Sequence, residues 1–179
     1  MPKIGDREEF PRLELKTIHG DLVAVPDAKT PWVHLQFRRF AGCAFCNMHL
    51  QKLIQNQSTI KAAGIHEVVI FQSSREVLLP HQGGFPFDII ADPEKILYQQ
   101  FGIETSPLAL LHPVALSNLV RAQMIPNRPK TIAENGTLGL PAEFLISQDG
   151  HVAKSHYGKH AYDQWSVDTL LRYASTQAV

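Results

Sequence analysis

Short apolar runs recur along the chain, at spacings that alternate between the period of a strand and that of a helix. In residues 13–27, two β-prone runs flank His19-Gly20-Asp21, where glycine can supply the positive φ of a tight turn, so we predict an N-terminal hairpin. Residues 32–40 (WVHLQFRRF) are apolar and aromatic with only loose alternation, as expected of a strand covered on both faces. We predict that this run is a central strand.

A strand–helix–strand unit is predicted next. From Cys43 to about Ala63 the apolar residues recur at helical spacing, and Gly64 follows as a stop signal. The run 66–74 has the composition of a second buried strand, so the unit predicts a parallel pairing with a right-handed crossover. The alternation continues with a helical piece at 74–82, a strand at 87–92, and a helix that Asp92-Pro93 caps and Gly102 ends.

The C-terminal part of the pattern predicts antiparallel strands and a closing helix. Residues 142–158 contain two strand-like runs around Gln148-Asp149-Gly150, which is typical of a hairpin, and residues 163–175 have the pattern of an amphipathic helix. Before them, residues 104–139 hold helical pieces that prolines interrupt, with too much apolar content for a free linker. We interpret 104–139 as a helical insertion that packs on the core.

Together these elements predict an α/β fold with a central mixed sheet flanked by helices. A chain of 179 residues can bury one sizeable core, so we expect a single domain over 1–179. Lys+Arg and Asp+Glu are both 17, so no excess positive field exists to attract nucleic acid or an acidic membrane. The N-terminus is charged and no apolar run has the length of a membrane span, so we expect a cytoplasmic protein.

Both cysteines of the chain fall in the segment Cys43-Ala44-Phe45-Cys46. In the cytoplasm thiols are kept reduced, so a close pair is more often catalytic or metal-binding than structural. The pair lies where the central strand gives way to a helix, whose free N–H groups and dipole stabilise a thiolate. One thiolate can then attack a substrate disulfide and the other can resolve the mixed intermediate. Arg38 and Arg39, just before this loop, are candidates for additional positive field.

Other interpretations of these residues stay open at this point. Cys43, Cys46 and His49 could recruit zinc, although three ligands on one helical segment rarely complete a tetrahedron. The two thiols could instead be buried and inert. Pro141, immediately before the strand that begins at 142, could adopt the cis form beside a substrate groove or be an ordinary trans proline at a strand start.

The order of the motifs is similar to that of a known family. Cys43-x-x-Cys46 after a strand, then FDIIADPEKILYQQFGI, then LPAEFLISQDGHV resembles the thioredoxin superfamily, specifically its peroxiredoxin-like AhpC/TSA branch, over about residues 13–174. The resemblance implies a thioredoxin-like fold, an active site at Cys43 and Cys46, and Pro141 as a cis-proline facing them. It implies a dithiol that reduces disulfides or hydroperoxides without a bound cofactor and is restored by a thioredoxin-like or glutathione-linked reductant. A homodimer is compatible with it.

Two orders of attack fit the resemblance. In thioredoxin-like enzymes the first cysteine, here Cys43, attacks, whereas the Thr-x-x-Cys pattern of peroxiredoxins places the reactive cysteine at Cys46. The chain departs from the peroxiredoxin pattern at two positions: Arg39 stands where its first proline is expected, and Pro141 stands where its peroxide-polarising arginine is expected.

The source of protons is a second open question. The buried acid of thioredoxin would fall near Phe37, so His49, His81, water or the substrate would have to transfer protons. A binding or scaffold protein of the same fold, with residues 104–139 as the partner surface and regulatory thiols, is the non-enzymatic alternative.

Overall fold

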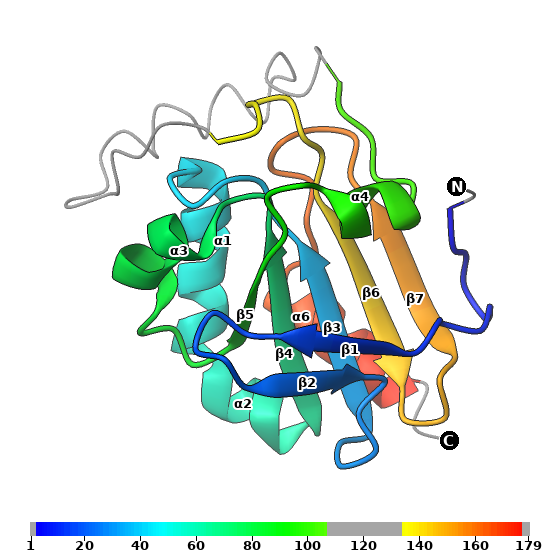
Figure 1. The fold of residues 1–179 in the computed structure, drawn as a ribbon. Helices are drawn as coiled ribbons and strands as arrows, with labels where there is room; N and C mark the ends of the chain where they lie inside the picture. Colours follow the sequence, from blue (N-terminus) through cyan, green and yellow to red (C-terminus); the bar gives the residue numbers. More distant parts are fainter. Residues whose placement is uncertain (1–2, 107–133, 177–179) are drawn as a thin grey trace.

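The computed structural model describes residues 3–106 and 134–176, and its main element is a five-stranded sheet with the order β5-β4-β3-β6-β7 (Figure 1). The strands are β3 (Trp32–Phe37), β4 (Ile65–Phe71), β5 (Asp88–Ala91), β6 (Ala142–Ser147) and β7 (Val152–Tyr157). The central strand β3 is parallel to β4 and antiparallel to β6. The sheet is therefore mixed, and the predicted α/β architecture is confirmed.

Helices cover one face of the sheet, and the N-terminal hairpin covers the other together with a short helix (Figure 1). The first face carries α1 (Ala44–Gln55), α2 (Gln57–Ala62) and α6 (Val167–Thr176), which share an apolar cluster with α3 (Arg75–Gln82). A second cluster joins the other face to the hairpin and to α4 (Ile96–Gln100). In the parts of the chain that the structure describes, no helix is long and apolar enough to cross a membrane.

The predicted N-terminal hairpin is confirmed. Strands β1 (Leu13–Lys16) and β2 (Leu22–Val25) pair antiparallel, with Lys16 opposite Leu22. Gly20 has a φ of 104° in the connecting turn, a conformation that favours glycine. Leu15, Val23 and Val25 are buried against the sheet, so the hairpin contributes to the second apolar cluster.

The predicted helix from Cys43 to Ala63 is two helices, α1 and α2, that meet at Asn56. This residue has a φ of −108°, outside the helical range, and its side-chain amide donates to the carbonyl of Lys52 at 2.8 Å. An asparagine side chain that bonds to nearby backbone competes with helical hydrogen bonds, so the helix breaks there.

Two other helices begin later than predicted. Lys95 adopts a left-handed φ of 56°, so α4 begins at Ile96, although Asp92 still caps it by accepting from the Ile96 N–H at 3.0 Å. The helix predicted from 163 begins at Val167, because Asp163 is engaged in the preceding turn, where it accepts from the Lys159 N–H at 2.7 Å.

The predicted cis bond at Pro141 is wrong: within residues 3–106 and 134–176 the cis peptide bond is Val25–Pro26, and the bond before Pro141 is trans. The chain is extended there, because Leu140 donates to the carbonyl of Glu104 at 3.1 Å and the carbonyl of Pro141 accepts from Gly158 at 2.9 Å. A backbone already extended on both sides of Pro141 needs no cis connection.

The predicted insertion at 104–139 lies mainly outside the described residues, but both of its ends are described. Thr105 and Gly139 form an antiparallel bridge, so the two ends lie side by side. Residues 134–136 lie against the end of β4: the Gln72 side chain donates to the carbonyl of Glu134 at 3.1 Å and to that of Gly136 at 2.6 Å. The described ends therefore pack on the carboxyl edge of the parallel strands.

Candidate functional site

Cys43 is the N-cap of α1, in the loop that follows β3. Its backbone is extended, with φ −65° and ψ 109°, and its sulfur accepts the N–H of Cys46 at 3.4 Å. The Cys43 N–H donates to the Phe40 carbonyl at 2.9 Å, which fixes the turn between strand and helix. The free N–H groups and positive dipole end of α1 therefore face the Cys43 sulfur, as the position of the motif predicted.

The two sulfurs lie together and are not bonded. The Cys46 thiol donates to the Cys43 Sγ at 2.8 Å, and both cysteines are free. Cys43 is 1% exposed and Cys46 is 0% exposed, so both side chains belong to the apolar cluster under α1. The geometry permits exchange between a dithiol and a disulfide. Because Cys43 is buried, a substrate reaches its sulfur only if the residues packed around it move.

The two thiols have opposite acidities. Burial alone raises the pKa of Cys43, but the hydrogen bond from Cys46 and the Arg39 charge outweigh it and lower the pKa to about 6. Burial raises the pKa of Cys46 well above its usual range, as do its hydrogen bond and proximity to Cys43. The reduced pair is therefore a Cys43 thiolate and a Cys46 thiol at neutral pH.

Arg39 holds a positive charge against the Cys43 sulfur. Its side chain is 2% exposed, and Nη1 donates to the Cys43 Sγ at 3.5 Å. Nη2 donates to the carbonyl of Thr137, and the guanidinium lies 5.4 Å from the centre of the Phe40 ring. Thr137, at the described end of the insertion, thus fixes the position of the Arg39 guanidinium beside Cys43.

A buried polar network lies between the sheet and α1. Arg38 is fully buried, and its Nη2 lies 3.0 Å from both Glu143 Oε1 and His49 Nδ1, while it also donates to the Gln36 side chain. Glu143 also accepts the N–H of Trp165 at 2.6 Å. The network therefore connects β3, β6, α1 and the segment before α6.

His49 is a neutral member of this network. Its Nε2 donates to the Trp165 carbonyl at 2.6 Å, so Nδ1 accepts from Arg38. Burial, and then the Arg38 charge, lower the pKa of His49 well below its usual range. Both ring nitrogens are engaged, so His49 is free neither to join a zinc site with the cysteines nor to carry their protons.

The network continues to a second buried acid, Glu67, whose carboxylate accepts from His34 Nδ1 at 2.9 Å and from the Gln36 side chain. Glu67 and Glu143 were missed at the sequence level. The available signal was the alternation His34-x-Gln36-x-Arg38 along β3 and the residue after it, which places three polar side chains on one face of a buried strand. Phe37 lies on the opposite face, in the second apolar cluster.

Of the residues predicted for the site, Cys43 and Cys46 contact each other. Pro141 packs on Gly158, where a Cβ atom would lie 2.7 Å from the Pro141 Cγ. His81 lies in the last turn of α3. The roles of Pro141 and His81 in catalysis stay predictions.

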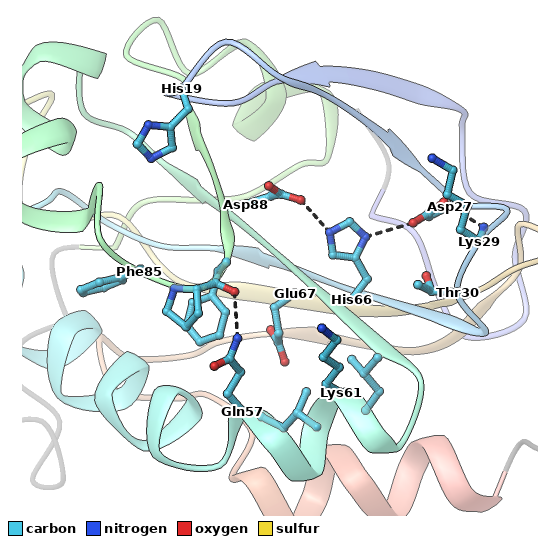
Figure 2. A pocket seen from close by; sticks show the side chains of 14 residues that line it. His19, Asp27, Lys29, Thr30, Gln57, Lys61, His66, Glu67, Phe85 and Asp88 are labelled. Atoms are coloured by element: carbon cyan, nitrogen blue, oxygen red, sulfur yellow. Dashed lines mark hydrogen bonds and ion pairs between the residues drawn. The ribbon is translucent and has the colours of Figure 1, made fainter.

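An open cavity of about 570 Å³ lies elsewhere, where α2, the start of β4 and the loops before β3 and β5 meet (Figure 2). His66 bridges two carboxylates there, with Nε2 2.7 Å from Asp88 and Nδ1 3.2 Å from Asp27. The hydrogen bond with Asp88 outweighs burial and raises the pKa of His66. Neither cysteine lines this cavity.

Comparison with known proteins agrees with this picture. A family model described as the AhpC/TSA family matches residues 7–155. None of the curated proteins matches the sequence.

Similar solved structures cover nearly the whole chain. Peroxidoxin BcpB from Mycobacterium tuberculosis has a TM-score of 0.65 at 12% identity, over 98% of this chain and 99% of that one. A Chlorobium tepidum protein described as the thiol:disulfide interchange protein DsbE has a TM-score of 0.63 at 18% identity, over 97% and 99%. A cysteine-to-serine mutant of the peroxiredoxin 6 of Arenicola marina has a TM-score of 0.66 at 18% identity, over 96% and 72%. At these identities the likeness shows the fold.

Proposed function

Because the chain belongs to the AhpC/TSA family, we propose that it is a thiol oxidoreductase in which Cys43 attacks the substrate and Cys46 resolves the intermediate. The observation that carries the proposal is the asymmetric pair: two sulfurs 2.8 Å apart, of which Cys43 is the thiolate and Cys46 the hydrogen-bond donor. A thiolate is the attacking form of cysteine, and a neighbouring thiol can close the ring afterwards.

With a disulfide substrate, the Cys43 thiolate attacks one sulfur, the substrate S–S bond breaks, and the second substrate thiolate leaves. Cys46 then loses its proton to water or to the departing first substrate thiolate, and its sulfur attacks Cys43, which releases that thiolate and leaves a Cys43–Cys46 disulfide. The substrate gains two electrons and the protein loses two. This order follows the thioredoxin-like pattern, and the likeness to a thiol:disulfide interchange protein supports it.

A hydroperoxide is the second candidate oxidant, and the position of Arg39 favours it. The Cys43 thiolate would attack one peroxide oxygen, form a sulfenic acid and expel hydroxide or alkoxide; Cys46 would then condense with the sulfenic acid and release water. Arg39, 3.5 Å from the sulfur, provides a cationic donor beside the developing oxyanion. It would take over the task of the arginine that Pro141 replaces.

The oxidised pair needs a reductant to complete the cycle. A thioredoxin-like or glutathione-linked thiol would attack the Cys43–Cys46 disulfide and restore both thiols. Such a cycle fits a reducing compartment and therefore a cytoplasmic location. A homodimer is compatible with it, and no bound cofactor takes part in either step.

The test compares wild type, Cys43→Ser and Cys46→Ser with an aromatic disulfide, hydrogen peroxide and an alkyl hydroperoxide. Cys46→Ser should trap a mixed disulfide or a sulfenic acid on Cys43, and Cys43→Ser should react with none of the oxidants. Trapping on Cys46 in the Cys43→Ser variant would reverse the order of attack. Wild type that loses no thiol with any oxidant, and whose thiols titrate near the usual value of about 8.5, would favour the scaffold alternative.

A further inference from the structure

Arg38 is a fully buried cation with an incomplete set of partners. Nη2 makes the bonds to Gln36, His49 and Glu143, whereas Nε and Nη1 are buried without a hydrogen-bond acceptor among the residues that the structure describes. A guanidinium stays protonated in proteins, and unpaired buried donors are costly. The residue therefore favours any negative charge that develops nearby.

The element next to this cation is the one that carries the second cysteine. His49, which binds Arg38, lies three residues after Cys46 on α1, so both side chains share one face of the helix. Glu143 and His49 also hold the two ends of one residue's backbone, since Glu143 accepts the N–H of Trp165 and His49 donates to its carbonyl. Arg38, Glu143, Trp165 and His49 thus form a closed ring that fixes the guanidinium under α1.

We propose that Arg38 is a positioning residue for the second half of the reaction: its charge stabilises the negative Cys46 sulfur that attacks the intermediate on Cys43. The inference rests on the proposed function, and it concerns a step that the Cys43 thiolate alone does not explain.

The reaction itself removes what keeps Cys46 protonated. Before the reaction, the Cys43 thiolate accepts the Cys46 proton and repels a second negative charge, which adds to burial in raising the pKa of Cys46. Once Cys43 is bonded to substrate, that negative charge is gone, and the charges of Arg39 and Arg38, which lower the Cys46 pKa, remain. Cys46 then gives up its proton and displaces the substrate thiolate.

The groups around Cys46 determine the sign of each expected effect. Cys43 faces it from its own helix, Arg39 from the preceding loop, Arg38 from the end of β3, and the buried hydroxyl of Tyr98 from α4. Glu143, on β6, partly neutralises Arg38 from 3.0 Å. Removing the Arg38 charge should therefore hinder Cys46, whereas removing the Glu143 charge should help it.

The experiment follows both halves of one turnover with dithiobisnitrobenzoate, an aromatic disulfide that releases one coloured thiolate when Cys43 attacks and another when Cys46 resolves. Wild type, Arg38→Met, Glu143→Gln and the double variant are compared across pH, with Arg172→Met as the matched control, since Arg172 is exposed and stacks on Tyr173. The double variant leaves neither charge buried, so it keeps the test valid if Arg38→Met alone does not fold.

The second release should slow about tenfold or more in Arg38→Met, the change in thiolate fraction for about one unit of pKa. The pH midpoint of the second release should rise in the order Glu143→Gln, wild type, double variant, Arg38→Met, and Arg172→Met should match wild type. If Arg38 had only a structural role, the second release would slow in each variant in proportion to the stability that the variant loses.

The two proposals fail in different ways. No first release from folded wild type would overturn the proposed function. A normal first release followed by a second release that keeps the wild-type midpoint in Arg38→Met and the double variant would overturn the role of Arg38 and leave the proposed function standing.

Discussion

Two histidines at opposite ends of the sheet show how differently this fold uses one side chain. His49 lies on α1, three residues after Cys46, at the carboxyl end of β3, and His66 lies near the start of the parallel strand β4. His49 accepts from Arg38 and donates to a carbonyl, so it is neutral. His66 lies between Asp27 and Asp88, which favour the imidazolium because two acceptors require two ring N–H groups. The partners, rather than the residue type, determine the charge.

The two ends also differ in access to solvent. The His66 end opens into a cavity of about 570 Å³, whereas Cys43 is 1% exposed. Cys43 nevertheless lies at the closed end, where the Cys46 thiol, the charge of Arg39 and the backbone N–H groups at the start of α1 lower its pKa. Under the proposed function, the chemistry therefore lies with the charges around Cys43 and not in the open cavity.

The largest expected effect comes from breaking the buried ion pair at the thiol end. Glu143→Ala removes the carboxylate partner of Arg38 and the acceptor of the Trp165 N–H, so a buried charge is left uncompensated. We expect the free energy of unfolding, measured in urea, to fall by about 3–5 kcal/mol.

The matched change at the open end is Asp88→Ala, which removes one of the two carboxylates at His66. This ion pair is partly exposed, so the expected loss is about 1 kcal/mol or less. Equal losses in the two variants would show that the polar network under α1 is no more sealed from solvent than the His66 cavity.

A smaller effect is expected on the acidity of Cys43. Arg39→Met removes the cation 3.5 Å from the sulfur, so the pKa of Cys43 should rise from about 6 by about one unit. The pH dependence of alkylation by iodoacetamide measures it. As the control, His66→Asn should leave the pH midpoint of alkylation at its wild-type value. An unchanged midpoint in Arg39→Met would show that Arg39 does not lower the pKa of Cys43.

Much of the fold was predictable because its signals are local. The cysteines at the end of an apolar strand, the glycine turn at Gly20 and the Asp92 cap each depend on a few neighbouring residues, and the structure places them as predicted. Helix starts were less accurate where a residue takes a non-helical conformation, as Lys95 does, or where a side chain binds the backbone of the preceding turn, as Asp163 does at Lys159.

The network could not be predicted because it depends on strand register. His34 lies opposite Glu67 and Gln36 opposite Glu143, although each pair is far apart in the chain. The alternation His34-x-Gln36-x-Arg38 signals a polar face, but nothing in the sequence near Glu67 or Glu143 shows which strand pairs with it. The surroundings of Pro141 likewise involve a distant residue, since the N–H of Leu140 donates to the carbonyl of Glu104.

The smallest expected effect is a pH-dependent contribution of His66 to stability. Its pKa in the folded chain is raised above the value of about 6.5 expected in the unfolded chain, so folding favours the protonated form. The stabilisation is fully present below about pH 6.5 and is lost as the pH rises through the folded-state pKa. His66→Asn keeps a polar side chain but has no charge to lose. The difference in unfolding free energy between wild type and His66→Asn should therefore be largest near about pH 6, about 1 kcal/mol or less, and shrink toward alkaline pH.

Urea unfolding at several pH values measures this difference, with His49→Asn as the contrast from the closed end of the sheet. His49 is neutral in the folded chain, so its variant should show no loss of stabilisation over the same alkaline range. A difference for His66→Asn that stays constant with pH would mean that the bridge between Asp27 and Asp88 does not depend on the imidazolium.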